Sequence, residues 1–142
     1  MIKQGFSLGE RDWYVMAYYN IKEKDLPEVY VLLTASGDRR KNVDDALSVL
    51  AKRNTGYTFT NFETHSTVVC ISSATSDSEL ISTITHEIKH VTEHISEYYD
   101  VDPKSEKSAY LQGKISEEMY KAFSLLICPK CAQNFKRKCG KL

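Results

Sequence analysis

Residues 76–98 read SDSELISTITHEIKHVTEHISEY, and this stretch predicts a long helix on which the rest of the chain packs. Ser76 with Glu79 three residues later is the capping-box signature of a helix N-terminus. At 100° per residue the apolar side chains fall in one stripe along the helix. That stripe comprises Leu80, Ile81, Ile84, Ile88, Val91, Ile95 and Tyr98.

The remaining positions divide into two further sectors. One sector is expected to face solvent and holds Ser82, Thr85, Lys89, Thr92 and Ser96. The other holds His86, His90 and His94. Because an ordinary surface helix has one apolar and one polar face, a separate histidine face predicts a metal site.

The segment HEIKH, residues 86–90, places two histidines one helical turn apart with Glu87 beside the first. Two neutral imidazoles four residues apart can bind one Zn²⁺, which lowers the pKa of a bound water from 15.7 to about 7. Glu87 is then predicted to be the general base that passes the proton to the leaving amine. The motif therefore predicts a zinc-dependent hydrolase, most simply a peptidase.

A catalytic zinc usually has three protein ligands, so a partner for His86 and His90 is expected. His94 lies eight residues from His86, roughly 12 Å along the helix axis, and is too far to share the ion. Glu106 fits best, because it begins a following helix that is predicted to fold back along the first. Three nearby acids are alternatives: Glu97, Asp100 and Asp102.

The rest of the chain predicts an α+β fold, in which a small antiparallel or mixed sheet packs on the motif helix and a C-terminal helix. Strands are expected over 12–21, 57–62 and 66–72, the last two as a hairpin. Helices are expected over 26–35, with Asp25 as cap, from Asn42 through Leu50, and from Asp102 or Ser105 to about Leu126. Residues 29–31 leave a strand possible within 26–35. Cys70 is expected to be a buried, inert thiol and His65 a solvated side chain.

The composition indicates one globular domain over residues 1–127, followed by a basic tail over 128–142. Lysine plus arginine and aspartate plus glutamate number 19 each, so no net field attracts nucleic acid or a membrane. Five of the basic residues lie in the tail, which has no acid, and the rest of the chain carries −5. With no apolar run of about 20 residues and no signal peptide at the start, we expect a cytoplasmic protein.

The tail contains a possible second metal site. Cys128 and Cys131 have the spacing of a zinc knuckle, and Cys139 offers a third thiolate. A structural zinc site has four ligands, so either Cys70, a partner chain or water completes the set, or the tail is a flexible basic end.

The HEIKH motif followed by Ser105-Glu106-Lys107-Ser108-Ala109-Tyr110-Leu111 resembles gluzincin-type zinc metallopeptidases. More narrowly, it resembles small phage-encoded metallopeptidases in which a glutamate precedes an Ala-Tyr-Leu run. The likeness covers roughly residues 55–120. It implies a zincin-like fold with the 66–72 strand near the cleft. It also implies zinc on His86, His90 and Glu106, Glu87 as the catalytic carboxylate, and a location in the host cytoplasm or the virion.

Two further roles follow as alternatives from the sequence. Tyr110, one turn from Glu106, could stabilise an oxyanion, although an aromatic residue at helical spacing usually belongs to the core. The chain could also be a non-catalytic zincin-like domain in a virion or other assembly. Its basic tail could then dock on an acidic protein surface or on nucleic acid.

Overall fold

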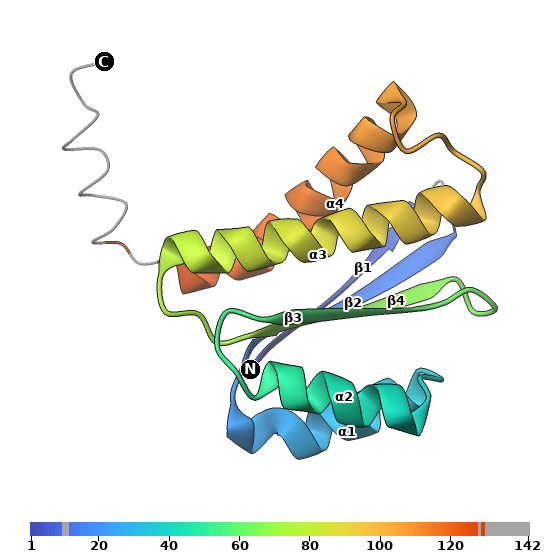
Figure 1. Ribbon diagram of the computed structural model, residues 1–142. Coiled ribbons are helices and arrows are strands. Elements are labelled where there is room, and N and C mark those ends of the chain that lie inside the picture. Colours follow the sequence, from blue (N-terminus) through green and yellow to red (C-terminus); the bar gives the residue numbers. More distant parts are fainter. Residues whose placement is uncertain (10–11, 128, 130–142) are drawn as a thin grey trace, which may run out of the picture.

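The structure is a computed structural model that describes residues 1–9, 12–127 and 129. A four-stranded sheet lies between two layers of helices, with α3 and α4 on one face and α1 and α2 on the other (Figure 1). The strands are β1 (Ile2–Leu8), β2 (Trp13–Ile21), β3 (Gly56–Asn61) and β4 (Ser66–Ser72). The helices are η2 (Glu23–Asp25), α1 (Leu26–Ala35), α2 (Arg40–Leu50), α3 (Asp77–Tyr98), α4 (Glu106–Phe123) and η3 (Ser124–Leu126).

The sheet is mixed, and its strand order is β1-β2-β4-β3. The outer pairs β1–β2 and β3–β4 are antiparallel, whereas the central pair β2–β4 is parallel. The predicted α+β class with a small mixed sheet is therefore confirmed. Among the described residues this order makes β3 an edge strand, so one side of its backbone has no neighbouring strand there.

The strand β1 was not predicted from the sequence. Its inward-facing residues Phe6 and Leu8 are buried, but Gln4, Gly5 and Ser7 weaken the alternation of apolar and polar residues. Pairing with β2 and packing against α4 supply the stabilisation that local propensity lacks.

The sheet has an apolar core on each face. Val15, Ala17 and Tyr19 of β2 pack toward α3 and α4, while Tyr18 packs toward α1 and α2. Because helices cover both faces, the central strands are apolar on both sides, as is usual for a parallel pair.

The motif helix is α3, as predicted, and Ser76 caps it by accepting a hydrogen bond from the Glu79 backbone N–H at 3.1 Å. Two side chains expected in solvent, Thr92 and Ser96, are buried instead. The reason is that α4 packs over this sector, where the hydroxyls of Ser96 and Ser108 lie 3.3 Å apart. At the borders of the apolar stripe, Ile81 and Tyr98 are exposed.

The other predicted elements are confirmed, with changes at their ends. Residues 26–35 form a helix rather than a strand, and residues 56–61 and 66–72 form the expected hairpin. Ser105 caps α4 by accepting from the Ser108 N–H. Asp25 stands at the predicted N-cap position of α1, but its side chain makes no capping hydrogen bond there, and its carboxylate accepts the Lys22 N–H instead.

None of the described helices combines the length and the hydropathy needed to cross a membrane. Cys128, Cys131 and Cys139 lie outside the described residues, as does all of the proposed tail over 128–142 except residue 129. The cysteine site and the domain boundary therefore stay predictions.

Candidate metal centre

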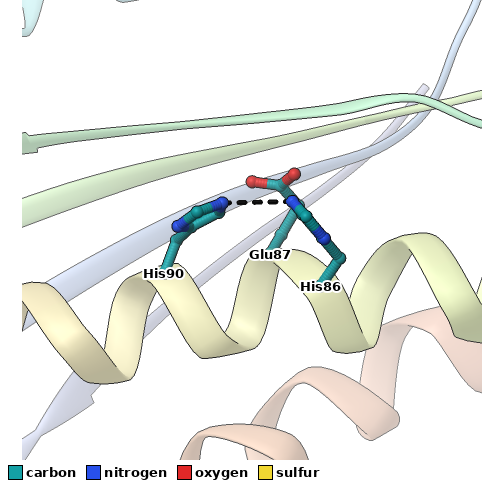
Figure 2. A group of neighbouring side chains, drawn as sticks. All are labelled: His86, Glu87 and His90. Atoms are coloured by element: carbon teal, nitrogen blue, oxygen red, sulfur yellow. Dashed lines mark hydrogen bonds between the residues drawn. The ribbon is translucent and has the colours of Figure 1, made fainter.

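His86 and His90 lie on successive turns of α3 and point their rings at each other (Figure 2). Their Nε2 atoms are 3.1 Å apart, and the two ring planes meet at 77°. His86 is exposed and His90 is half-buried, so the nitrogen pair is accessible from solvent. The predicted convergence of the two imidazoles is present in the structure.

The separation of the two nitrogens fits a shared zinc ion. Two ligands of a tetrahedral Zn²⁺ with Zn–N bonds of 2.0–2.1 Å stand about 3.3 Å apart. The observed 3.1 Å is close to that value without any change of rotamer. Both nitrogens can supply a lone pair when the imidazoles are neutral and protonated on Nδ1.

Glu87 is the third member of the group and is only 4% exposed. Its Oε2 accepts a hydrogen bond from the Thr58 hydroxyl at 2.6 Å, and its side chain lies against Gly56. The three ligand atoms, one from each residue, all lie within 4.8 Å of one another. A buried carboxylate beside the two nitrogens suits a base that acts on a water at the metal.

A pocket of about 300 Å³ opens beside His86 and Glu87. Its walls come from Asn54 just before β3, from Gly56 at the start of β3, and from Glu79 and Ser82 of α3. This volume is at the low end of ligand pockets and could hold one side chain or a short length of peptide.

The strand that borders the group is β3, which carries both Gly56 and Thr58. The resemblance had implied the strand over 66–72 instead. That strand is β4, which lies one position further into the sheet.

The structure does not bring Glu106 to the two histidines. Glu106 is exposed and lines a separate hollow with Ala109, Tyr110 and Gly113 on the outer side of α4. The nearby contact between helices joins Ser108 to Ser96, which lies six residues or roughly 9 Å beyond His90 along α3.

Among the described residues, the His86, Glu87 and His90 cluster is the one group of three that could hold a metal ion. It includes neither Glu106 nor the alternative acids Glu97, Asp100 and Asp102. Tyr110 is exposed beside Glu106, so it belongs neither to the core nor to the histidine site.

His94 stays outside the group, as its spacing predicts. Its Nδ1 is 2.8 Å from the Thr60 hydroxyl, and burial, followed by the nearby His90, lowers the pKa of His94.

His65 is not simply solvated: its ring stacks on Trp13 and its Nε2 lies 2.6 Å from the Tyr98 hydroxyl. Cys70 is buried, and that burial raises the pKa of its thiol, in agreement with an inert side chain.

Sequence reasoning missed Gly56, Thr58 and Thr60, the side of β3 that faces α3. A signal was present, because these alternate positions carry only a glycine and two threonines. Small and hydroxyl-bearing residues on one strand face leave room for polar side chains from a neighbouring helix.

Comparisons with protein-family models, with curated proteins and with solved structures found no match.

Proposed function

We propose that the chain is a zinc-dependent hydrolase that cleaves peptide bonds, with His86 and His90 as zinc ligands and Glu87 as general base. The observation that carries this proposal is the Nε2 pair at 3.1 Å beside a carboxylate that Thr58 holds in place. Two converging imidazoles and an adjacent oriented base are the protein parts that metal-assisted hydrolysis uses.

A bound zinc ion would supply a Lewis acid that lowers the pKa of water and polarises the scissile carbonyl. Glu87 would accept the proton of the attacking water on Oε1 and deliver it to the leaving amine. Its Oε2 is occupied by the Thr58 hydroxyl, so Oε1 is the oxygen left to carry the proton. Thr58 thereby orients the Glu87 carboxylate and leaves Oε1 as the oxygen that accepts the proton.

The arrangement of the helix and the edge strand supports a zincin-like fold. The motif lies on a long helix, and an antiparallel edge strand runs beside it. The likeness to small phage-encoded metallopeptidases draws support from His86, Glu87 and His90. It draws none from Glu106, which lies apart.

The position of Glu106 favours a second candidate function. Without a separate third ligand, Glu87 could itself bind the metal as the third ligand, which would leave no base for hydrolysis. The domain would then bind metal for stability within an assembly, as in the non-catalytic alternative.

Zinc content and proteolysis, measured together, separate the two functions. Purified wild type is expected to hold one zinc at this site, and His86→Ala and His90→Ala to contain about one zinc per chain less than wild type. His94→Ala is the matched control for zinc content, since it removes a histidine of the same helix that lies outside the group. Lys89→Ala, at an exposed position that pairs with Glu93, is the control for cleavage.

Glu87→Gln then assigns the role of the carboxylate. A hydrolase predicts that Glu87→Gln keeps its zinc and stops cleaving fluorescein-labelled casein. A structural role in which Glu87 binds the metal predicts that Glu87→Gln loses zinc and that wild type does not cleave. A wild-type protein without zinc would overturn both functions.

A further inference from the structure

A continuous chain of hydrogen bonds runs from the protein core to His94. Trp13 Nε1–H donates to Thr67 Oγ1 at 2.9 Å, and Thr67 Oγ1 lies 3.0 Å from Thr60 Oγ1. The Thr60 hydroxyl is in turn 2.8 Å from His94 Nδ1. These contacts link β2, β4, β3 and α3, so the chain crosses the sheet to the helix that carries the metal group.

The buried end of the chain sets its direction. An indole N–H can only donate, so Thr67 Oγ1 must accept from Trp13. Thr67 is 1% exposed, and Thr60 Oγ1 is the acceptor within reach of its hydroxyl proton. Thr60 therefore accepts from Thr67 and donates its own proton to His94 Nδ1. The opposite direction would leave the buried Thr67 proton without an acceptor.

This direction determines the tautomer of His94. With Nδ1 accepting from Thr60, the neutral ring carries its proton on Nε2. The two ring nitrogens point in divergent directions, so the Nε2–H points away from β3. Among the described residues, Nε2 has no hydrogen-bond partner, and the His94 side chain is half-buried. The Nε2–H is therefore a donor with a fixed direction and no partner among the described residues.

This donor lies beside the metal group. His94 is one turn beyond His90, and the two rings are 6.3 Å apart at an angle of 30°. The Phe62 ring also packs against the His94 ring, with the two centroids 6.2 Å apart, and limits its movement. An extended peptide advances about 3.3 Å per residue, so a spacing of 6.3 Å corresponds to two residues.

We infer that His94 is a substrate-binding residue whose Nε2–H donates a hydrogen bond to a backbone carbonyl of an extended peptide, about two residues from the scissile bond. Thr60, Thr67 and Trp13 are positioning residues that hold the ring in the donor tautomer. The inference rests on the proposed hydrolase function and adds to it a contact that recognises the peptide backbone rather than a particular side chain.

The tautomer can be tested without any activity. In the zinc-loaded protein, ¹⁵N–¹H correlation spectra of the histidine rings are expected to show His94 protonated on Nε2. Thr60→Ser, which keeps the hydroxyl, should retain this pattern, and Thr60→Val should give a mixture of tautomers. A wild-type ring protonated on Nδ1 would overturn the inference whether or not the protein is a hydrolase.

Kinetics test the contact with substrate. For labelled casein we expect KM to rise about three- to tenfold in His94→Ala and Thr60→Val, because each variant loses one neutral hydrogen bond to the substrate. The kcat of both variants should stay within about twofold of wild type. Thr60→Ser should restore the wild-type KM, and zinc content should not change in any of the three variants. An unchanged KM in His94→Ala would overturn the inference alone. Zinc-loaded wild type that fails to cleave casein would overturn the proposed function, and this inference with it.

Discussion

The backbone of Gly56 lies directly against the side chain of Glu87. A Cβ built on Gly56 would stand 2.5 Å from Glu87 Cγ and 2.7 Å from Glu87 Oε1. The Glu87 side chain cannot easily move away, because it is buried and its Oε2 is hydrogen-bonded to Thr58. The edge strand therefore positions the candidate base from two sides, through a close backbone approach and through a hydroxyl.

Gly56→Ala is expected to abolish most casein cleavage while zinc stays bound. The added methyl group displaces the Glu87 carboxylate, because the three atoms nearest to it all belong to Glu87 and none to His86 or His90. Overpacking of this kind costs about 1–3 kcal/mol of stability. Zinc content, thermal unfolding and cleavage rates measure the three effects.

Gly113→Ala is the matched control, because a Cβ there meets nothing within 4 Å. It lies inside α4 and should stabilise the protein by about 0.5–1 kcal/mol without changing cleavage. Full activity of Gly56→Ala would show that cleavage does not require the Glu87 carboxylate in the position that it has against Gly56.

Thr58→Val is expected to lower kcat about ten- to a hundredfold, the usual effect of removing a side chain that orients a catalytic group. The substitution deletes the hydroxyl that donates to Glu87 Oε2 and keeps the shape of the side chain. Thr58→Ser retains the hydroxyl and should stay close to wild type. If Thr58→Val and Thr58→Ser were equally active, the hydrogen bond would have no part in catalysis.

Glu106→Gln is expected to keep the zinc content and cleavage rate of wild type. Glu106 is exposed on α4 and lies outside the group formed by His86, Glu87 and His90. Zinc titration of Glu106→Gln beside His86→Ala makes the comparison direct. A loss of zinc as large as that of His86→Ala would instead make Glu106 the third ligand and require the start of α4 to approach the histidines.

Tyr57→Phe is expected to reduce stability by about 1.5–3 kcal/mol, since it removes a hydrogen bond to a charged group. The Tyr57 hydroxyl donates to Asp38 Oδ2 at 2.6 Å, and Asp38 is 6% exposed. This bond joins β3 to the turn between α1 and α2. Urea unfolding at neutral pH measures the loss.

The same variant should change the response to alkali. Burial, followed by the hydrogen bond and charge of Asp38, raises the pKa of Tyr57 above its ordinary value of 10.0. A raised pKa means that the contribution of Tyr57 to stability is complete below pH 10 and is lost as the pH rises further. Wild type should therefore lose more stability than Tyr57→Phe between about pH 8 and about pH 11. Burial also raises the pKa of Tyr19, so both proteins should still lose some free energy of unfolding as the pH rises. Equal slopes in the two proteins would exclude a contribution from Tyr57.

Local patterns predicted the elements that position the candidate site. The cap at Ser76, the helix over 77–98 and the convergence of His86 and His90 follow from spacing within one segment. The hairpin of β3 and β4 was also predicted, because alternation and a short connection are properties of neighbouring residues.

Contacts between distant segments were predicted less well. Ser96 was expected in solvent and is 1% exposed, because α4 covers it. Nothing in the periodicity of one helix specifies which of its polar sectors a second helix will cover. The weakly patterned β1 is likewise stabilised by its partners rather than by its own residues.

The sequence by itself determined which side chains can do chemistry and that His86, Glu87 and His90 belong together, since the 3.6-residue helical repeat sets their spacing. Only the tertiary structure decided what surrounds them. It placed Gly56 and Thr58 against Glu87, joined Trp13 to His94 through two threonines and left Glu106 on the outside of α4. These relationships depend on the strand order of the sheet and on how α3 and α4 pack, both of which arise from contacts between residues far apart in the chain.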